Sequence, residues 1–152
     1  MLVGVISDTH GLLRPEALDA LAGVEHILHA GDVGNADILD RLREIAPVTA
    51  IRGNIDVHGP CAELPATEAI ELAGYFIYIV HAIEDLDLKP SAAKIDFVIS
   101  GHSHKASTVR KDGVLYLNPG SAGPRRFLLP VTLMLLRLEV GRAIPELIEL
   151  AV

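Results

Sequence analysis

The chain has 152 residues, half of them apolar, with a formal net charge of −7 and one cysteine. This length is typical of a single domain with a real hydrophobic core, here residues 1–152, and the apolar share excludes a disordered chain. The acidic balance argues against a nucleic-acid binder, so no stable nucleic-acid complex is expected, and the lone Cys61 excludes an internal disulfide and fits a cytoplasmic location.

Short apolar runs alternate with helical patterns in the first third of the chain. Each run ends in a polar loop, which predicts strands at residues 2–6, 25–29 and 48–51. Between them, helices are expected at residues 15–21, with Pro15 in the first turn, and at residues 35–45, with Asn35 as the cap. This alternation is typical of a parallel sheet with crossover helices.

After Asn54 the chain changes to a pattern of hairpins. Strands are expected at residues 67–72, 75–80, 97–100, 106–110, 114–117, 131–140 and 144–150. Residues 83–94 form a weak helix or an irregular segment, and Pro145 weakens the last strand. Residues 131–138 are too short and too interrupted by Arg137 to span a bilayer, and residues 1–8 lack the features of a signal peptide, so no membrane partner is expected. The sequence predicts one α/β domain with two sheets and helices outside.

Polar side chains follow five of these strands at the point where each strand ends. Because the carboxyl ends of parallel strands line the ligand crevice of a sheet, these side chains are expected to converge on one rim. They are Asp8, His10, Asp32, Asn54, His81, His102 and His104.

The chemistry of this set points to metal ions. Two aspartates, four histidines and one asparagine suit divalent Mn, Fe, Co, Ni or Zn better than Cu(I) or an iron–sulfur cluster, and imidazole is too abundant for a Ca or Mg site. The set is too large for one ion and sufficient for two. Two neighbouring cations need a bridging ligand, which makes Asp32 or Asp8 the candidate bridge.

The order of the motifs resembles the calcineurin-like metallophosphoesterase superfamily, and in particular its small bacterial and archaeal phosphodiesterase branch. Any single motif is weak, but five in order, each at a strand end, are specific. Asn118-Pro119-Gly120-Ser121 resembles a further stretch of that branch. The motifs are Asp8-Thr9-His10, Gly31-Asp32, Gly53-Asn54, an isolated His81 and Gly101-His102-Ser103-His104.

This resemblance implies a two-sheet α/β/β/α sandwich with a binuclear metal site at the carboxyl ends of the strands. Its ions would be two divalent metals, with Mn the first choice. The implied ligands are Asp8, His10 and His104 for one ion, Asn54, His81 and His102 for the other, and Asp32 as the bridge. Asn54 would also bind the substrate phosphate, and Asn54 and Asp32 would be the catalytic residues.

The implied reaction is hydrolysis of a small phosphodiester, with a hydroxide between the ions attacking phosphorus in line. A charge count supports the diester. Two dications and two aspartates leave a net charge of +2, which one hydroxide and a singly charged diester cancel.

Two positions depart from the family pattern. Ile55 stands where many members of the superfamily have a histidine that assists the leaving group, so esters with good leaving groups are favoured, and His58, nearby in sequence, is a candidate substitute. Ala82 stands where glycine usually follows the histidine motif, which would strain the backbone if φ were positive there. Asp56 matches an acidic residue of the branch that supports a metal ligand.

Other residues are expected to have ordinary structural roles. His26 and His29 are interpreted as packed or surface histidines, and Arg125 and Arg126 as parts of a solvated loop. Two other functions stay open: a protein-interaction scaffold like the subunit of this fold in the eukaryotic retromer, which would show eroded metal ligands, and a phosphomonoesterase. The apolar C-terminal strands make a homodimer reasonable.

Overall fold

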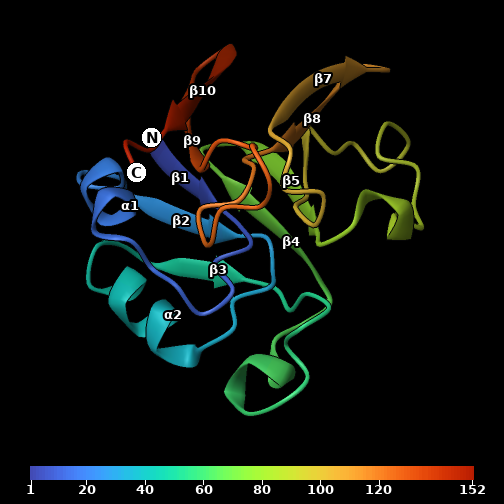
Figure 1. The fold of residues 1–152 in the computed structure, drawn as a ribbon. Coiled ribbons are helices and arrows are strands. Elements are labelled where there is room, and N and C mark those ends of the chain that lie inside the picture. The colour runs from blue at the N-terminus through green and yellow to red at the C-terminus, as the bar shows by residue number, and fades with distance from the viewer.

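Two five-stranded sheets form the framework of the chain, and the computed structural model describes all of residues 1–152 (Figure 1). The first sheet has the order β10(Arg142–Glu149), β9(Thr132–Glu139), β1(Leu2–Ile6), β2(His26–His29) and β3(Val48–Ala50). The second has the order β4(Thr67–Leu72), β5(Tyr75–Val80), β6(Phe97–Ile99), β8(Val114–Asn118) and β7(Ser107–Lys111). Buried residues of both sheets form one shared core, so the sheets pack against each other.

Strand direction follows the connections between the strands. Strands β1, β2 and β3 are parallel, as are β5, β6 and β8, whereas the hairpin partners β4, β7 and β10 run antiparallel to their neighbours. Both sheets therefore have a parallel centre whose carboxyl ends can present loops on one rim.

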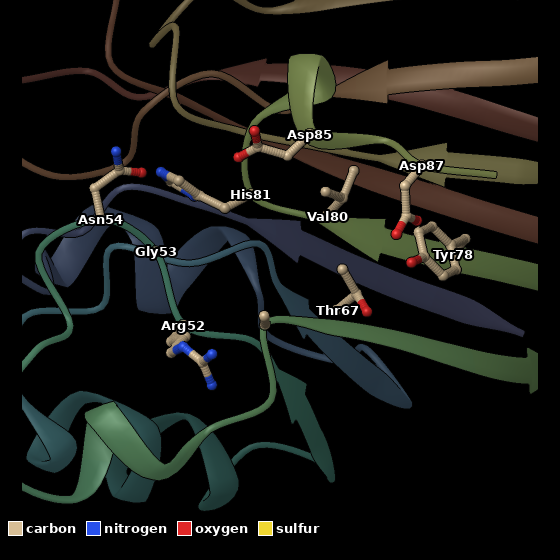
Figure 2. A pocket seen from close by; sticks show the side chains of 10 residues that line it. Arg52, Gly53, Asn54, Thr67, Tyr78, Val80, His81, Asp85 and Asp87 are labelled. Carbon is tan, nitrogen blue, oxygen red and sulfur yellow. The ribbon is translucent and has the colours of Figure 1, made fainter.

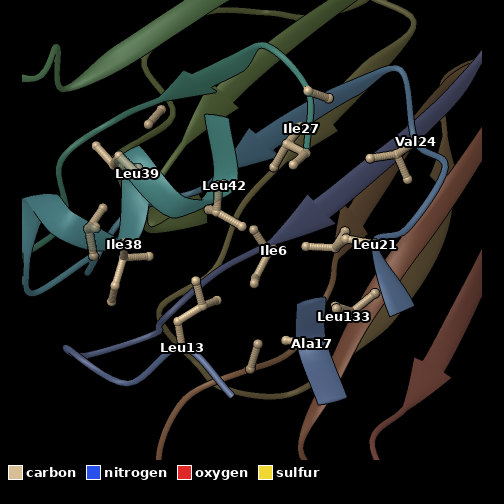
Figure 3. Packing of buried hydrophobic residues seen from close by; sticks show 14 of the residues in the cluster. Ile6, Leu13, Ala17, Leu21, Val24, Ile27, Ile38, Leu39, Leu42 and Leu133 are labelled. Atoms are coloured by element: carbon tan, nitrogen blue, oxygen red, sulfur yellow. The ribbon is translucent and has the colours of Figure 1, made fainter. Parts of the chain in front are cut away.

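Two α-helices cover the outer face of the first sheet. They are α1(Pro15–Ala20) and α2(Ala36–Arg43), and the Asn35 side chain caps α2 by accepting a hydrogen bond from the Asp37 N–H at 2.9 Å. Their apolar faces bury Ala17, Leu39 and Leu42 against the sheet (Figure 3). Replacing the fully buried Leu42 with alanine would cost about 2–5 kcal/mol of stability. No helix of the chain is long and apolar enough to cross a membrane.

The outer face of the second sheet has a different cover. Between β5 and β6 the chain forms only the short 3-10 turn η2(Ile83–Asp85), where the sequence left open a weak helix, and Leu86 and Ile95 pack on Val80 and Val98 of the sheet. The predicted sandwich of two sheets with α-helices is confirmed, but this outer layer is irregular rather than helical. The last predicted strand is present as β10, and it is an edge strand that pairs along its length with β9, which is a position where a sheet tolerates Pro145.

Candidate metal centre

The structure brings together side chains from the loops that follow five strands. The first sheet supplies Asp8 and His10 after β1, Asp32 after β2 and Asn54 after β3, and the second sheet supplies His81 after β5 and His102 and His104 after β6. The rim is therefore shared by two sheets rather than formed by one open sheet.

Two buried aspartates lie at the middle of this rim. The Asp32 Oδ2 atom lies 3.3 Å from His10 Nε2 and 3.2 Å from His81 Nε2. The Asp8 Oδ1 atom lies 3.7 Å from His10 Nε2 and 3.5 Å from His104 Nε2. The donor atoms form two overlapping groups that can each hold an ion, Asp8 with His10 and His104, and Asp8 with Asp32 and His81.

The tautomer of His81 requires a cation beside it. Its Nδ1 lies 2.7 Å from the Ala30 carbonyl oxygen, which only accepts hydrogen bonds, so Nδ1 carries the proton. In the neutral ring Nε2 then presents a lone pair, and it faces the Asp32 carboxylate, which is also an acceptor. Two acceptors in contact need a proton or a metal ion between them.

The hydrogen-bond inventory agrees with this requirement. Buried atoms without a partner are rare in native proteins, and each calls for an explanation. Four of the five such side-chain atoms in this chain belong to the centre: Asp8 Oδ1, His10 Nε2, His81 Nε2 and His104 Nδ1. The residues present therefore fit divalent metal ions.

Asp8 directs its free oxygen because its other oxygen is already bound. Its Oδ2 accepts hydrogen bonds from Ser7 Oγ at 2.7 Å and from the His102 N–H at 3.1 Å. Only Oδ1 remains for the histidine cluster. Ser7 could not be selected from the sequence, because its role depends on one side-chain rotamer.

The backbone at the centre is held in an unusual conformation. Among the ligand candidates, Asp8, His10, Asp32, His102 and His104 all have positive φ, between 47° and 72°. Asp and His tolerate this region better than most residues, but it still costs of the order of 1–3 kcal/mol each and is typical of functional sites. The ligand loops therefore hold backbone conformations that serve the site and lower local stability.

Two glycines allow the loops to approach closely. A Cβ atom at Gly53 would overlap the Asp32 carboxylate, and one at Gly101 would overlap Ser7 Oγ. The glycines beside the ligand motifs are therefore more than ordinary turn formers.

Asp56 is buried and supports the loops rather than a ligand side chain. Its carboxylate accepts hydrogen bonds from the N–H groups of Val33 at 3.1 Å, Gly34 at 3.0 Å and Gly53 at 2.8 Å. It thereby joins the loop that carries Asp32 to the loop that carries Asn54. Ala82 has a φ of −110°, an extended conformation open to any residue, so the strain considered there is absent.

Asn118 and Ser121 hold the histidine loop and the first aspartate. The Asn118 side chain donates to the Gly101 carbonyl at 3.0 Å, and Ser121 Oγ donates to the Asp8 carbonyl at 2.9 Å. The segment from Asn118 to Ser121 therefore braces two ligand loops.

His29 has a larger structural role than its sequence position indicates. It is fully buried, accepts a hydrogen bond from the Gly31 N–H at Nδ1, and lies 3.1 Å from Thr9 Oγ1 through Nε2. Burial lowers the pKa of this imidazole to about 4, so the ring is neutral at ordinary pH. His29 therefore links the loop that precedes Asp32 to the loop that contains His10.

The electrostatics of Asp32 and His81 are coupled through their contact. Burial opposes ionisation of Asp32, but its contact with His81 and the Ile55 N–H outweigh burial and lower the pKa of the carboxyl to about 2. Burial also opposes protonation of His81, but Asp32 and the Ala30 carbonyl raise its pKa above the ordinary value. When no metal ion is bound, a proton shared between His81 and Asp32 takes the place of the ion at this contact.

Asn54 and His102 are the exposed members of the set. Figure 2 shows the Asn54 side chain directed toward His81, and the His102 ring packs edge-on against the His81 ring with centroids 5.2 Å apart. His102 does not belong to either close group of carboxylate and imidazole donor atoms. Asn54 and His102 border the buried atoms on the solvent side.

The remaining candidates lie outside the centre. His58 is exposed and has no side-chain hydrogen bond, and the Arg125 guanidinium donates to the carbonyls of Leu129 and Val152. Burial lowers the pKa of His104, and the charge of Arg126 contributes in the same direction.

Comparison with known proteins agrees with this architecture. Residues 1–141 match the model of the calcineurin-like phosphoesterase superfamily domain. A probable metallophosphoesterase of Methanothermobacter thermautotrophicus is 36% identical, covering 98% of this chain and 92% of that protein. Another from Methanocaldococcus jannaschii is 37% identical, and the match covers 80% of this chain and 68% of that protein. The chain belongs to the calcineurin-like phosphoesterase superfamily, as its motifs predicted.

Solved structures share the fold. Vps29 of Entamoeba histolytica in complex with Zn²⁺ is similar with a TM-score of 0.75 and 26% identity, over 98% of this chain and 99% of that one. A novel archaeal phosphodiesterase is similar with a TM-score of 0.74 and 23% identity, over 97% of this chain and 100% of that one. At this identity the similarity is evidence for the fold alone.

Proposed function

We propose that the protein is a metal-dependent phosphodiesterase that hydrolyses small phosphodiesters. The observation that carries the proposal is the contact of His81 Nε2 with the Asp32 carboxylate, two acceptors that need a cation. Membership of the phosphoesterase superfamily gives the reaction class. The similarity to an archaeal phosphodiesterase favours the diester, as does the charge count.

Of the two proposed ligand sets, the first coincides with one close group of donor atoms, and the second shares only His81 with the other group. Asp8, His10 and His104 would hold one divalent ion, and His81, His102 and Asn54 the other. Asp32 is the proposed bridge because its Oδ2 lies within 3.3 Å of both His10 and His81, which belong to different sets. Mn²⁺ is the proposed native metal, and a cytoplasmic location is part of the same proposal.

When bound, the ions would activate water and neutralise charge on the phosphoryl oxygens. The Asn54 amide, exposed beside His81, would donate a hydrogen bond to a phosphoryl oxygen. In the net reaction the oxygen of water forms a bond to phosphorus, one P–O ester bond breaks, and the proton of water reaches the released alkoxide. Ile55 offers no proton to that alkoxide, so the leaving group must leave without help from this position.

The test compares two chromogenic esters after the protein is stripped with chelator. Bis(p-nitrophenyl) phosphate and p-nitrophenyl phosphate are assayed with and without Mn²⁺, and Asp32→Asn serves as the control for contaminating enzymes. We expect Mn-dependent cleavage that favours the diester and is lost in the control. A preference for the monoester would instead indicate a phosphomonoesterase.

A protein-interaction role is the second candidate, because several solved structures with this fold are Vps29 proteins. This role needs no catalysis. Failure to bind any divalent metal and failure to cleave either ester would favour it over the hydrolase.

A further inference from the structure

An acidic cavity opens beside the candidate metal centre. Its volume is about 520 Å³, and it lies between the segment that follows β3 and the segment that follows β5 (Figure 2). Asn54 and His81 line it together with Tyr78, Asp85 and Asp87. Because Asn54 and His81 are also metal-ligand candidates, the cavity begins where a phosphorus atom would be held.

The carboxylates of this acidic cavity lack cationic partners. Asp85 and Asp87 form no salt bridge, and Arg52, which also lines the cavity, donates from its guanidinium to the Leu64 carbonyl at 2.7 Å. In Figure 2 the Arg52 side chain points away from both carboxylates. Two acidic residues alone do not define a site, but His81 lines the same cavity with 6% exposure and an Nε2 atom without a hydrogen-bond partner.

A second cavity has the opposite chemistry. Its volume is about 500 Å³, and it is lined by Lys105 and Arg126 together with the apolar residues Phe127, Leu128 and Leu129. None of the ligand candidates lines it. A group bonded to a phosphorus atom beside Asn54 and His81 therefore enters the acidic cavity more directly than the basic one.

We propose that the acidic cavity binds one ester group of the substrate and selects an alcohol that carries an ammonium group. This inference rests on the proposed phosphodiesterase function. Carboxylates only accept hydrogen bonds, so Asp85 and Asp87 pair with an ammonium or, more weakly, with hydroxyl donors. A further phosphate or carboxylate on the same ester group is repelled.

Competitive inhibition tests the charge preference without depending on which ester bond breaks. The probes are methyl phosphodiesters of ethanolamine, ethylene glycol and glycolic acid, which differ mainly in charge, against Mn-dependent hydrolysis of bis(p-nitrophenyl) phosphate. We expect the ammonium ester to bind about tenfold more tightly than the carboxylate ester, since each exposed ion pair contributes only modestly. In the Asp85→Asn/Asp87→Asn double variant this ratio falls to about twofold.

Glu84 provides a matched control on the same 3-10 turn. It is exposed and adjacent to Asp85 but lines a different cavity, so Glu84→Gln removes one negative charge from the same turn without touching the acidic cavity. We expect Glu84→Gln to keep the wild-type ratio. A general effect of net charge would change the ratio in Glu84→Gln as well and would overturn the assignment to this cavity.

The outcomes separate this inference from the proposed function. Absence of any diester hydrolysis by the wild type removes the proposed function, and amide shifts of Tyr78, Asp85 and Asp87 on titration with the ammonium ester then report binding without turnover. Hydrolysis with equal inhibition by the three esters overturns the inference alone. Tighter binding of the carboxylate ester also overturns it and moves the group to the side of Lys105 and Arg126.

Discussion

The candidate metal centre has a buried group, Asp8, Asp32, His81 and His104, and an exposed pair, Asn54 and His102. Within the buried group Asp8, Asp32 and His81 are fixed by hydrogen bonds, whereas the exposed pair is held by its backbone and by one ring contact. Pre-organised ligands bind a metal without first being ordered. We therefore expect the ion at the buried group to bind first and most tightly, and the ion that needs the exposed pair to bind second.

The largest expected effect comes from the centre of the buried group. In Asp8→Asn the amide oxygen would replace Oδ2 as the acceptor for Ser7 Oγ and the His102 N–H, which turns the NH₂ group toward the histidines. Because Asp8 Oδ1 belongs to both groups of donor atoms, we expect both ions to be lost and diester hydrolysis to fall roughly 10²–10³-fold. Metal content by mass spectrometry and rates with Mn²⁺ check this. Wild-type metal content would contradict it, and Asp37→Asn on the exposed face of α2 is the control.

Acid should lower the free energy of unfolding through His29, which packs beside the buried group. Its pKa falls from 6.5 to about 4 on folding, so between these values the unfolded chain binds a proton that the folded chain does not. The free energy of unfolding therefore falls as pH falls through this window, by up to about 3 kcal/mol, and His29 contributes no pH dependence above it.

Urea unfolding of the chelator-treated protein at pH 4.5, 5.5 and 7 measures this loss of stability. The His29→Asn variant should be less stable at pH 7 but should lose less stability toward pH 4.5. For each protein, the slope of the free energy of unfolding against pH is obtained from these measurements. The difference between the two slopes isolates His29, since the histidines of the metal centre are common to both proteins. Parallel slopes for the two proteins would show that His29 does not carry the effect.

Asp56 connects the buried group to the exposed pair. Asp56→Asn replaces one acceptor oxygen by a donor facing backbone N–H groups, which should cost about 1–3 kcal/mol of stability. Because the loop of Asn54 is released more than that of Asp8, affinity for the second ion should fall more than affinity for the first. Metal titration by calorimetry measures both. Equal losses at the two sites would argue against a selective connection.

The sequence was sufficient for the strands and for the convergence of polar side chains at their ends, because both follow from local apolar runs and from strand direction. The helix cap at Asn35 could also be predicted, because it depends on a contact with Asp37, two residues away. The irregular cover of the second sheet could not be predicted, since residues 83–94 were also compatible with a weak helix and Leu86 is held by packing on Val80 and Val98.

Residues that act across the chain could not be found from local patterns. Asn118 binds the Gly101 carbonyl, and His29 binds Thr9, through contacts between separate loops. The glycine that the family has at position 82 predicts strain for Ala82, but the value of φ depends on how η2 leaves the sheet. Family motifs identify ligand types, whereas loop braces and backbone angles require the packed structure.

The smallest expected effect, and the most direct test of the two-part centre, is removal of the exposed histidine. His102→Gly removes the imidazole and suits the φ of 72° at this position, so the loop should keep its conformation. We expect the second ion to bind about tenfold more weakly while the first is unchanged, because removal of one exposed ligand leaves the buried group intact. Calorimetric titration with Mn²⁺ should then show two steps farther apart than in the wild type, and excess Mn²⁺ should restore much of the rate. The exposed His58→Gly is the control. Loss of the first step in His102→Gly would show that the exposed pair and the buried group act as one unit, and the proposed order of binding would have to be abandoned.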